Sequence, residues 1–310
     1  MNKIFKNLVV SSVYAGLLFS GLSQGKSIKN RYGVTQGGKV PQSQLNGISH
    51  EIKSTLGHMD QSHYEDIVAN PELAVNDEER LAALSAREIF ILVDRSGSMN
   101  APDENPAGMR SHQGWTRWDS ARVAAESISE LAIALDADNK IDIMLWDGDK
   151  YGRLNHKYET MTDVGQIGSF FINNPPQRGS TPLTEALEKV YQDRLKPLLQ
   201  RNEPFTVVVL TDGAPNNRNT AKHFFKNVIK ENNLEVSGHE TLAAFSFVRM
   251  GDDEGAMAFL EDLDDNLISQ LQVNVDIVDT KEDNFLFGTG KFQGQEGVGP
   301  LAVFWDALYD

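Results

Sequence analysis

The sequence predicts an α/β fold in which an open, mainly parallel sheet carries helices on both of its faces. From Arg87 onward, short apolar runs alternate with longer amphipathic segments, which is the order expected of strand–helix–strand crossovers. The run Phe205–Leu210 (FTVVVL) is almost unbroken in its hydrophobicity, as parallel strands buried on both faces are. A chain of 310 residues, 40% of them hydrophobic, is long enough for one such domain with additional segments at its ends.

The predicted elements follow one another in a regular order. Glu88–Val93 (EIFILV) has the length of a strand, and a loop rich in Gly, Pro and Asn follows over residues 97–115. Thr116 to Asp119 have the pattern of a helix capping box, and apolar residues at steps of three and four from Trp118 onward predict a helix with one apolar face. Further strands are expected at Ile141–Trp146, Phe205–Leu210, Thr241–Val248 and Val273–Val278, and further helices at Pro182–Val190, Asn219–Lys230 and Glu254–Leu263.

The first 86 residues divide into three segments that precede this domain. Residues 1–23 join two lysines to an uncharged stretch, Leu8–Leu22, which is typical of a secretory signal but also fits an amphipathic segment of a cytoplasmic protein. Export is the favoured interpretation, and the stretch is too short for a stable membrane span. Residues 24–45 are polar and Gly-rich, which predicts a flexible linker, and apolar residues at helical spacing within 46–86 predict a helical lead-in.

Charge and cysteine content exclude several classes of function. Residues 1–50 hold six Lys or Arg and no acidic residue, so the net charge of −15 leaves −21 for residues 51–310. An acidic chain of this kind repels phosphate backbones, and nucleic-acid binding is therefore not expected. The sequence has no cysteine, which excludes disulfides, thiol catalysis and Cys-ligated metal sites.

Polar residues at the carboxyl ends of the predicted strands are the candidates for a functional site, because open parallel sheets bind ligands there. The first strand ends in Asp94, and Ser96 and Ser98 follow within the string DRSGSM. A later apolar strand (FTVVVL) is followed by Asp212. These segments are far apart in the sequence, and the fold class predicts that their ends meet.

A third loop contributes Thr181, which opens the helix that begins near Pro182. Together with the strand-end residues it completes a set of two carboxylates and three hydroxyls, all of which offer oxygen. Oxygen donors with few carboxylates suit a hard divalent cation such as Mg²⁺, which keeps several waters in its shell. The sequence therefore predicts a divalent-cation site at this edge of the sheet.

With these residues the chain resembles the von Willebrand factor type A (VWA) domain family, whose Rossmann-like fold carries a metal-ion-dependent adhesion site. That site uses a D-x-S-x-S string, a threonine of a later loop and an aspartate after the fourth strand. The matching residues in this sequence are Asp94, Ser96, Ser98, Thr181 and Asp212. The resemblance covers about residues 87–280, and the domain is expected to span residues 87–282.

The sequence resembles one branch of this family in particular, and it departs from the family pattern at two places. The stretch FSFVRMGDDEGAMAFLEDLDD, followed by VDIVDT, is similar to stand-alone VWA proteins of bacteria and fungi, which favours the cytoplasm and so opposes the signal-like start of the chain. Ser180 stands where many members have a second glycine, and a long insertion, Met99–Trp115, lies beside the site.

The resemblance implies divalent-cation-dependent protein binding, in which Mg²⁺, or Mn²⁺ or Ca²⁺ in its place, coordinates an Asp or Glu of a partner protein. A strand ending in Asp94 also fits a metal-dependent phosphotransferase or hydrolase. Against that alternative, Ser96 stands where haloacid-dehalogenase-like enzymes have a second aspartate, and His112 is the nearest candidate base. A structural scaffold with a vestigial site is a third possibility. We expect a binding protein rather than an enzyme.

Other conspicuous features have structural interpretations. Acidic residues crowd the segment Gly251–Asn266, but the apolar residues between them recur at helical spacing and predict a solvated helix face. Asp147 and Asp149 follow the second strand and are expected in a turn. Residues 283–310 form a C-terminal tail whose apolar end, Val298–Tyr309, is expected to pack on the domain.

Overall fold

The computed structural model describes residues 53–309 apart from 55, 75–76, 104–114, 137, 214, 216 and 288–298. The signal-like segment 1–23, the linker 24–45 and the first part of the helical lead-in lie outside the described residues, as does His112. Among the described residues, no helix combines the length and the apolar character that a bilayer crossing requires.

The described residues form one six-stranded sheet with the strand order β3-β2-β1-β4-β5-β6. All neighbouring pairs are parallel except β2 and β3, which pair antiparallel at one edge. This arrangement confirms the predicted open, mainly parallel α/β sheet. The strands are β1 Glu88–Asp94, β2 Ile141–Gly148, β3 Leu154–Met161, β4 Phe205–Thr211, β5 Ala243–Arg249 and β6 Val278–Glu282.

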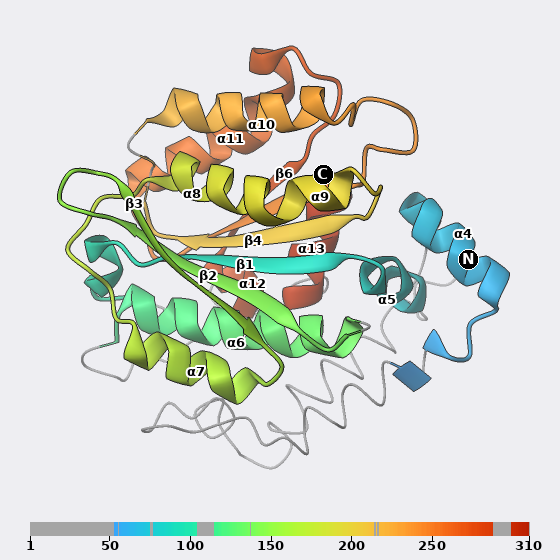
Figure 1. Ribbon diagram of the computed structural model, residues 1–310, viewed down its shortest axis with the longest axis horizontal. Helices are drawn as coiled ribbons and strands as arrows, with labels where there is room; N and C mark the ends of the chain where they lie inside the picture. Colours follow the sequence, from blue (N-terminus) through green and yellow to red (C-terminus); the bar gives the residue numbers. More distant parts are fainter. Residues whose placement is uncertain are drawn as a thin grey trace.

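Helices cover both faces of the sheet (Figure 1). One face packs against α6 (Arg117–Leu135), α7 (Val164–Asn173), α12 (Asp283–Phe287) and α13 (Pro300–Tyr309). The other packs against α8 (Leu183–Val190), the π-helical turn η4 (Tyr191–Leu195), α9 (Lys196–Leu199), α10 (Arg218–Glu231) and α11 (Glu254–Leu271). The lead-in forms α4 (Gln61–Ala69), η1 (Pro71–Leu73) and α5 (Asp77–Ser85), and η2 (Gly97–Asn100) follows β1.

Alternation along β1 shows how the sequence builds these two layers. Ile89, Ile91 and Val93 belong to the core under α6, whereas Phe90 and Leu92 belong to the core under α8 and α10. Because successive side chains of a strand point to opposite faces, a strand covered by helices on both sides must be apolar throughout. An apolar segment without polar interruptions therefore indicates a strand that is buried on both faces of the sheet.

The helix predicted after the capping box begins where expected. Thr116 Oγ1 accepts a hydrogen bond from Asp119 N, and the Asp119 carboxylate accepts one from Thr116 N at 2.9 Å. The resulting helix, α6, is buried along most of its length, including Trp118. The cap therefore fixes where α6 starts, beside the end of β1.

Two elements at the sheet edge were not predicted. β3 has the sequence LNHKYETM and is mostly exposed, so it lacks the apolar run by which the buried strands were recognised. It pairs with β2 as an antiparallel edge strand, and α7 follows it on the face of α6. Polar side chains are common on edge strands, because an apolar edge would invite pairing with other chains.

The strand predicted at Val273–Val278 was wrong in position. β6 begins at Val278, where pairing with Phe245 of β5 starts. The apolar residues before Val278 are buried in the core but do not pair with a neighbouring strand. The hydrophobic pattern therefore identified the buried segment correctly but not the residues that form β-sheet hydrogen bonds. Helix α11 is also eight residues longer than predicted, because its apolar stripe continues through Leu267 and Leu271 past the acidic residues.

The C-terminal helix α13 lies against the sheet on the face of α6 (Figure 1). Leu301, Val303, Phe304 and Ala307 are buried there. The charged face of α11, by contrast, lies away from its buried stripe, as expected for a solvated helix face.

Candidate metal centre

Asp94 and Asp212 stand at the carboxyl ends of two neighbouring strands. β1 and β4 pair in parallel with Val93 opposite Leu210, so both strands leave the sheet at the same edge. The Thr211 hydroxyl donates a 2.8 Å hydrogen bond to Asp94 Oδ2 and ties the two strand ends together. Both carboxylates are buried, with 0% and 1% of the residue surface exposed.

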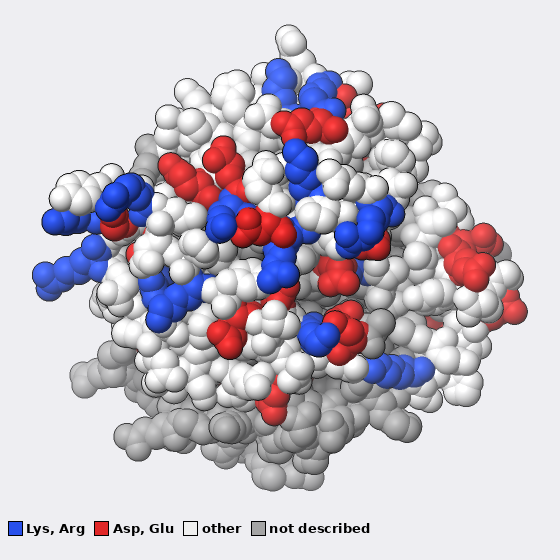
Figure 2. Space-filling model, viewed as in Figure 1, with Lys and Arg blue, Asp and Glu red and all other residues white. Residues whose placement is uncertain are grey.

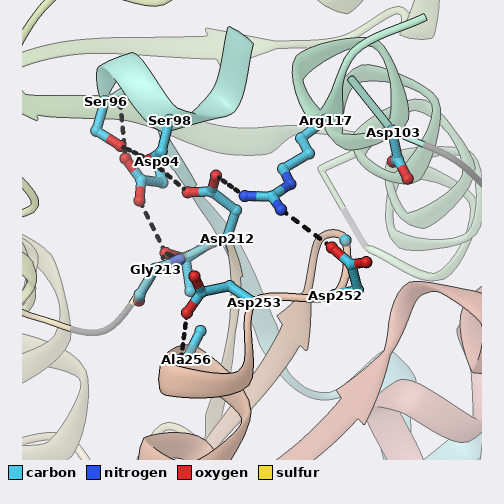
Figure 3. A network of polar contacts seen from close by, with 12 residues as sticks. Asp94, Ser96, Ser98, Asp103, Arg117, Asp212, Gly213, Asp252, Asp253 and Ala256 are labelled. Carbon is cyan, nitrogen blue, oxygen red and sulfur yellow. Dashed lines mark hydrogen bonds and ion pairs between the residues drawn. The ribbon is translucent and has the colours of Figure 1, made fainter. Parts of the chain in front are cut away.

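The loop after β1 turns two serine hydroxyls toward these carboxylates (Figure 3). Ser96 N donates to Asp94 Oδ1 at 2.8 Å, which fixes the first step of the loop. Ser96 Oγ and Ser98 Oγ are 3.0 Å apart, and Ser98 Oγ donates to Asp212 Oδ1 at 2.8 Å. Ser98 is exposed, so the cluster opens to solvent on that side.

Thr181 comes to the same place from the loop before α8. A Cβ built on Gly213, the residue after Asp212, would lie 3.6 Å from Thr181 Oγ1. Backbone hydrogen bonds of 2.9 Å, from Gln177 N to Arg95 O and from Gly148 N to Ser180 O, hold this loop against the ends of β1 and β2. The structure thus joins Asp94, Ser96, Ser98 and Asp212 in one cluster and places Thr181 beside Gly213, the residue that follows Asp212.

Electrostatics at the cluster favour further positive charge. Burial, and then repulsion from Asp212, raises the pKa of Asp94 to about 7, although hydrogen bonds from Ser96 and Thr211 act in the opposite direction. Arg117 Nη1 lies 2.8 Å from Asp212 Oδ2 and supplies one positive charge. Of the two buried carboxylates, Asp212 therefore has a guanidinium partner, whereas Asp94 accepts hydrogen bonds from Ser96 N and Thr211 Oγ1.

Arg117 is the residue of this site that sequence reasoning missed. Its Nη2 lies 3.2 Å from Oδ1 of Asp252, whose side chain is 90% exposed, so the guanidinium bridges a buried and an exposed carboxylate. Gly251 adopts a φ of +73°, and a Cβ there would overlap Arg117 Nε, so the glycine makes room for the guanidinium.

A sequence signal for Arg117 did exist. It is the first residue of α6, where the helix dipole disfavours a cation. A basic residue directly after a helix N-cap indicates that something other than the helix holds the charge, and here that partner is Asp212.

The prediction that Asp147 is a turn residue was wrong. Asp147 lies inside β2 with 2% of its surface exposed, and Arg95 Nε donates to its Oδ2 at 2.6 Å. Asn155 of β3 donates to the other carboxylate oxygen at 3.0 Å. Asp149 does organise the turn after β2, where it accepts hydrogen bonds from the amides of Tyr151 and Arg153.

Ser180, the departure from the family pattern, is accommodated by its neighbour Gly148. A Cβ on Gly148 would overlap Ser180 Oγ, so the absent side chain in β2 leaves room for the added one in the loop. Most of the insertion Met99–Trp115 lies outside the described residues. At its far end, Trp115 Nε1 donates to Ser120 Oγ at 2.8 Å, and Trp115 is buried.

The donor set fits a hard divalent cation that relies on hydroxyls. Within the ranges that the structure describes, no three His, Cys, Asp or Glu side chains are grouped to hold a metal. A cation at the strand ends would therefore need the serine and threonine oxygens as well as the two carboxylates, and such mixed oxygen ligands suit Mg²⁺, Mn²⁺ and Ca²⁺.

Comparisons with known proteins found similar solved structures but no match in sequence. No protein-family model matches the sequence, and no curated protein does. Among solved structures, the chain is similar to the SpRpn10 VWA domain, with 15% identity and a TM-score of 0.42 over 63% of this chain and 87% of that one. It is also similar to a manganese-loaded TRAP protein of Plasmodium vivax, with 16% identity and a TM-score of 0.38 over 65% and 70% of the two chains. At these scores we draw no conclusion from the similarities.

Proposed function

We propose that this chain is a VWA-type binding module, in which a divalent cation held by Asp94, Ser96, Ser98, Thr181 and Asp212 binds a carboxylate of a partner protein. The observation that carries the proposal is the convergence of these five oxygen-bearing side chains from three loops. Buried carboxylates lie beneath an exposed serine hydroxyl, so the cluster faces solvent with its polar groups.

The residues would divide the work of holding the cation. Asp94 organises the loop, since its two oxygens already accept hydrogen bonds from Ser96 N and Thr211 Oγ1. The Ser98 hydroxyl lies within hydrogen-bond distance of both the Ser96 hydroxyl and the Asp212 carboxylate, which is the spacing expected of ligands around one small ion. A bound divalent cation would supply a coordination position for an outside oxygen ligand.

Binding is favoured over phosphoryl transfer by the residues at the end of β1. A phosphotransferase of this geometry needs an aspartate nucleophile and a separate acid or base. Asp94 is fully buried, and Ser96 occupies the position where such enzymes place their acid. The segments Asp94–Ser98, Arg178–Pro182 and Thr211–Gly213 contain no histidine.

The test of the cation site is Mn²⁺ binding measured by electron paramagnetic resonance. Asp94→Ala should weaken binding by at least a hundredfold, because it removes a carboxylate and releases the loop that carries both serines. The matched control is Asp193→Ala, which removes an exposed carboxylate paired with Lys189 on the helix surface. Equal Mn²⁺ affinities for wild type and Asp94→Ala would contradict the proposal.

Partner binding is tested by affinity capture from cells of the source, with Mg²⁺ or with EDTA in the buffer. Partners should be retained with Mg²⁺ and lost with EDTA, and Thr181→Ala should weaken retention. Retention of the same proteins in EDTA would show that the chain binds them through another surface.

A further inference from the structure

A pocket of about 500 Å³ opens beside the candidate metal centre. It is lined by the loop after β1, the turn between β2 and β3, and the loop before α8. The lining residues are Gly97, Asp149, Lys150, Gly152, Arg178, Gly179 and Ser180. Figure 2 shows Lys and Arg side chains gathered at the left edge of the molecule, where Figure 1 places the turn between β2 and β3.

The pocket and the candidate metal centre are built from the same loops. Gly97 stands between Ser96 and Ser98, and Ser180 immediately precedes Thr181. A Cβ on Gly97 would lie 3.6 Å from Arg178 Cα, so the two loops pack backbone against backbone. A ligand that reached the cation would therefore lie next to the pocket.

Two cations in the pocket have no acidic partner among the residues that the structure describes. Lys150 and Arg178 are exposed, and within the described residues neither forms an ion pair. The neighbouring Asp149 is held by Arg153, whose guanidinium lies 2.7 Å from it. The pocket thus presents a net positive charge, although residues 51–310 as a whole carry −21.

Further groups in and beside the pocket suit a polar peptide. Ser180 Oγ is buried and makes no hydrogen bond within the described part of the chain. Tyr151, next to the pocket, is 70% exposed, and Lys150 Nζ lies 4.9 Å from the centre of its ring. Exposed aromatic and basic side chains together are typical of surfaces that bind acidic peptides.

We infer that this basic pocket binds a second carboxylate of the same partner segment, so that the module recognises a peptide with two acidic residues a few positions apart. The inference rests on the proposed function, because the first carboxylate is the one that coordinates the cation. An extended peptide advances about 3.3 Å per residue, so a short acidic segment reaches from the cation to the adjoining pocket. The pocket also explains how an acidic protein attracts an acidic partner, since attraction at short range offsets the screened repulsion of the rest of the surface.

The experiment measures how end-capped, fluorescein-labelled ten-residue peptides bind the full chain in the presence of Mn²⁺. The peptides carry no Asp, one Asp, or two Asp at separations of two to six residues in a Gly/Ser background. At the best separation, the second Asp should tighten binding by roughly three- to tenfold, the range expected of one or two exposed ion pairs.

Lys150→Glu/Arg178→Glu should abolish the advantage of the second Asp and leave the one-Asp peptide within about threefold. The matched control is Lys189→Glu/Lys226→Glu, which makes the same change in charge on α8 and α10 and should preserve the advantage. Equal affinities of wild type for one-Asp and two-Asp peptides at every separation would overturn the inference, as would an advantage that survives in the pocket variant.

Failure of the proposed function has a different signature. Mn²⁺ binding is measured on the same samples without peptide, and its absence in wild type would remove the cation site itself. Intact Mn²⁺ binding with no advantage from a second Asp would instead leave the cation site in place and refute the pocket alone.

Discussion

The buried charges at the two ends of the sheet differ in how the protein satisfies them. At the amino end, Arg87 is 4% exposed, and its guanidinium donates to Thr206 Oγ1 at 2.9 Å and to the carbonyl oxygens of Thr241 and Phe205. At the carboxyl end, the candidate metal centre holds two buried carboxylates, of which only Asp212 pairs with a guanidinium, and the cluster opens to solvent at Ser98. The charge of Arg87 is satisfied by oxygens of the protein itself, so it stabilises the fold. The carboxylates at the other end are not fully neutralised and open to solvent, so they are suited to binding a ligand.

The largest expected effect is at the amino end. Arg87→Met removes the guanidinium but keeps most of the side-chain volume, which leaves two buried acceptors and one partly buried acceptor without their donor. Each unsatisfied buried group costs about 1–3 kcal/mol, so we expect the free energy of unfolding to fall by about 3–5 kcal/mol. Urea unfolding followed by circular dichroism measures this loss.

The same variant should keep its affinity for Mn²⁺ where it is folded, because Arg87 lies at the opposite end of β1 from Asp94. A loss of Mn²⁺ affinity in folded Arg87→Met would show that the two ends of the sheet are not independent.

The buried carboxylate of Glu126 lies outside the two ends of the sheet and predicts a pH dependence of stability that does not involve the candidate metal centre. Burial raises the pKa of Glu126 to about 7 from an ordinary value of 4.5, and the ion pair with Arg122 offsets only part of the effect. The folded state therefore binds a proton that the unfolded state has released, so stability falls as pH rises from about 4.5 to about 7. At 1.36 kcal/mol per pKa unit, this group contributes a fall on the order of 3 kcal/mol.

Glu126→Gln should remove that part of the pH dependence and be more stable than wild type above pH 7. Denaturant unfolding at a series of pH values for both proteins gives the difference directly. Parallel stability curves for the two proteins would contradict the assignment. Added Mg²⁺ should not change the difference, because Glu126 is not one of the proposed ligands.

A smaller effect is expected at Arg117, and it has two opposite parts. Arg117→Gln breaks the pair with the buried Asp212 but retains one hydrogen-bond donor, so unfolding without metal should become easier by about 2 kcal/mol, less than the full cost of an unpaired buried charge. Mn²⁺ affinity should rise, because no guanidinium then competes for the Asp212 carboxylate. Thermal melting with and without Mn²⁺ measures both parts, and a lower affinity in the variant would mean that Arg117 supports the site rather than competing with the cation.

Hydrophobic runs and loop chemistry predicted most of the fold that bears on the site. The strands β1, β2, β4 and β5 are largely apolar because helices cover both of their faces. Once these strands were identified, the polar residues at their ends could be predicted as candidates for the site. Polar β3 could not be found in this way, since it is an edge strand with little burial. β6 was misplaced because the buried residues before it are as apolar as a strand.

The candidate site was predicted more completely than its electrostatics. Asp94, Ser96 and Ser98 are close in sequence, and the strand order brings Asp212 to them. The partners of the charges come from distant segments, however. The local sequence did not indicate that Asp147 would pair with Arg95. The position of Arg117 after a helix N-cap indicated that its charge has a partner but not that the partners are Asp212 and Asp252, because such pairs depend on which loops meet at the edge of the sheet.

The most direct test of the cation site is Mn²⁺ binding by the double variant Ser96→Ala/Ser98→Ala, measured by electron paramagnetic resonance. This variant leaves every carboxylate of the chain in place and removes only two of the three hydroxyls that the site is proposed to need. The account predicts that Mn²⁺ affinity falls by at least tenfold while the melting temperature without metal changes little. Unchanged Mn²⁺ affinity would contradict it, because the ion would then be bound by carboxylates alone or elsewhere on this acidic chain.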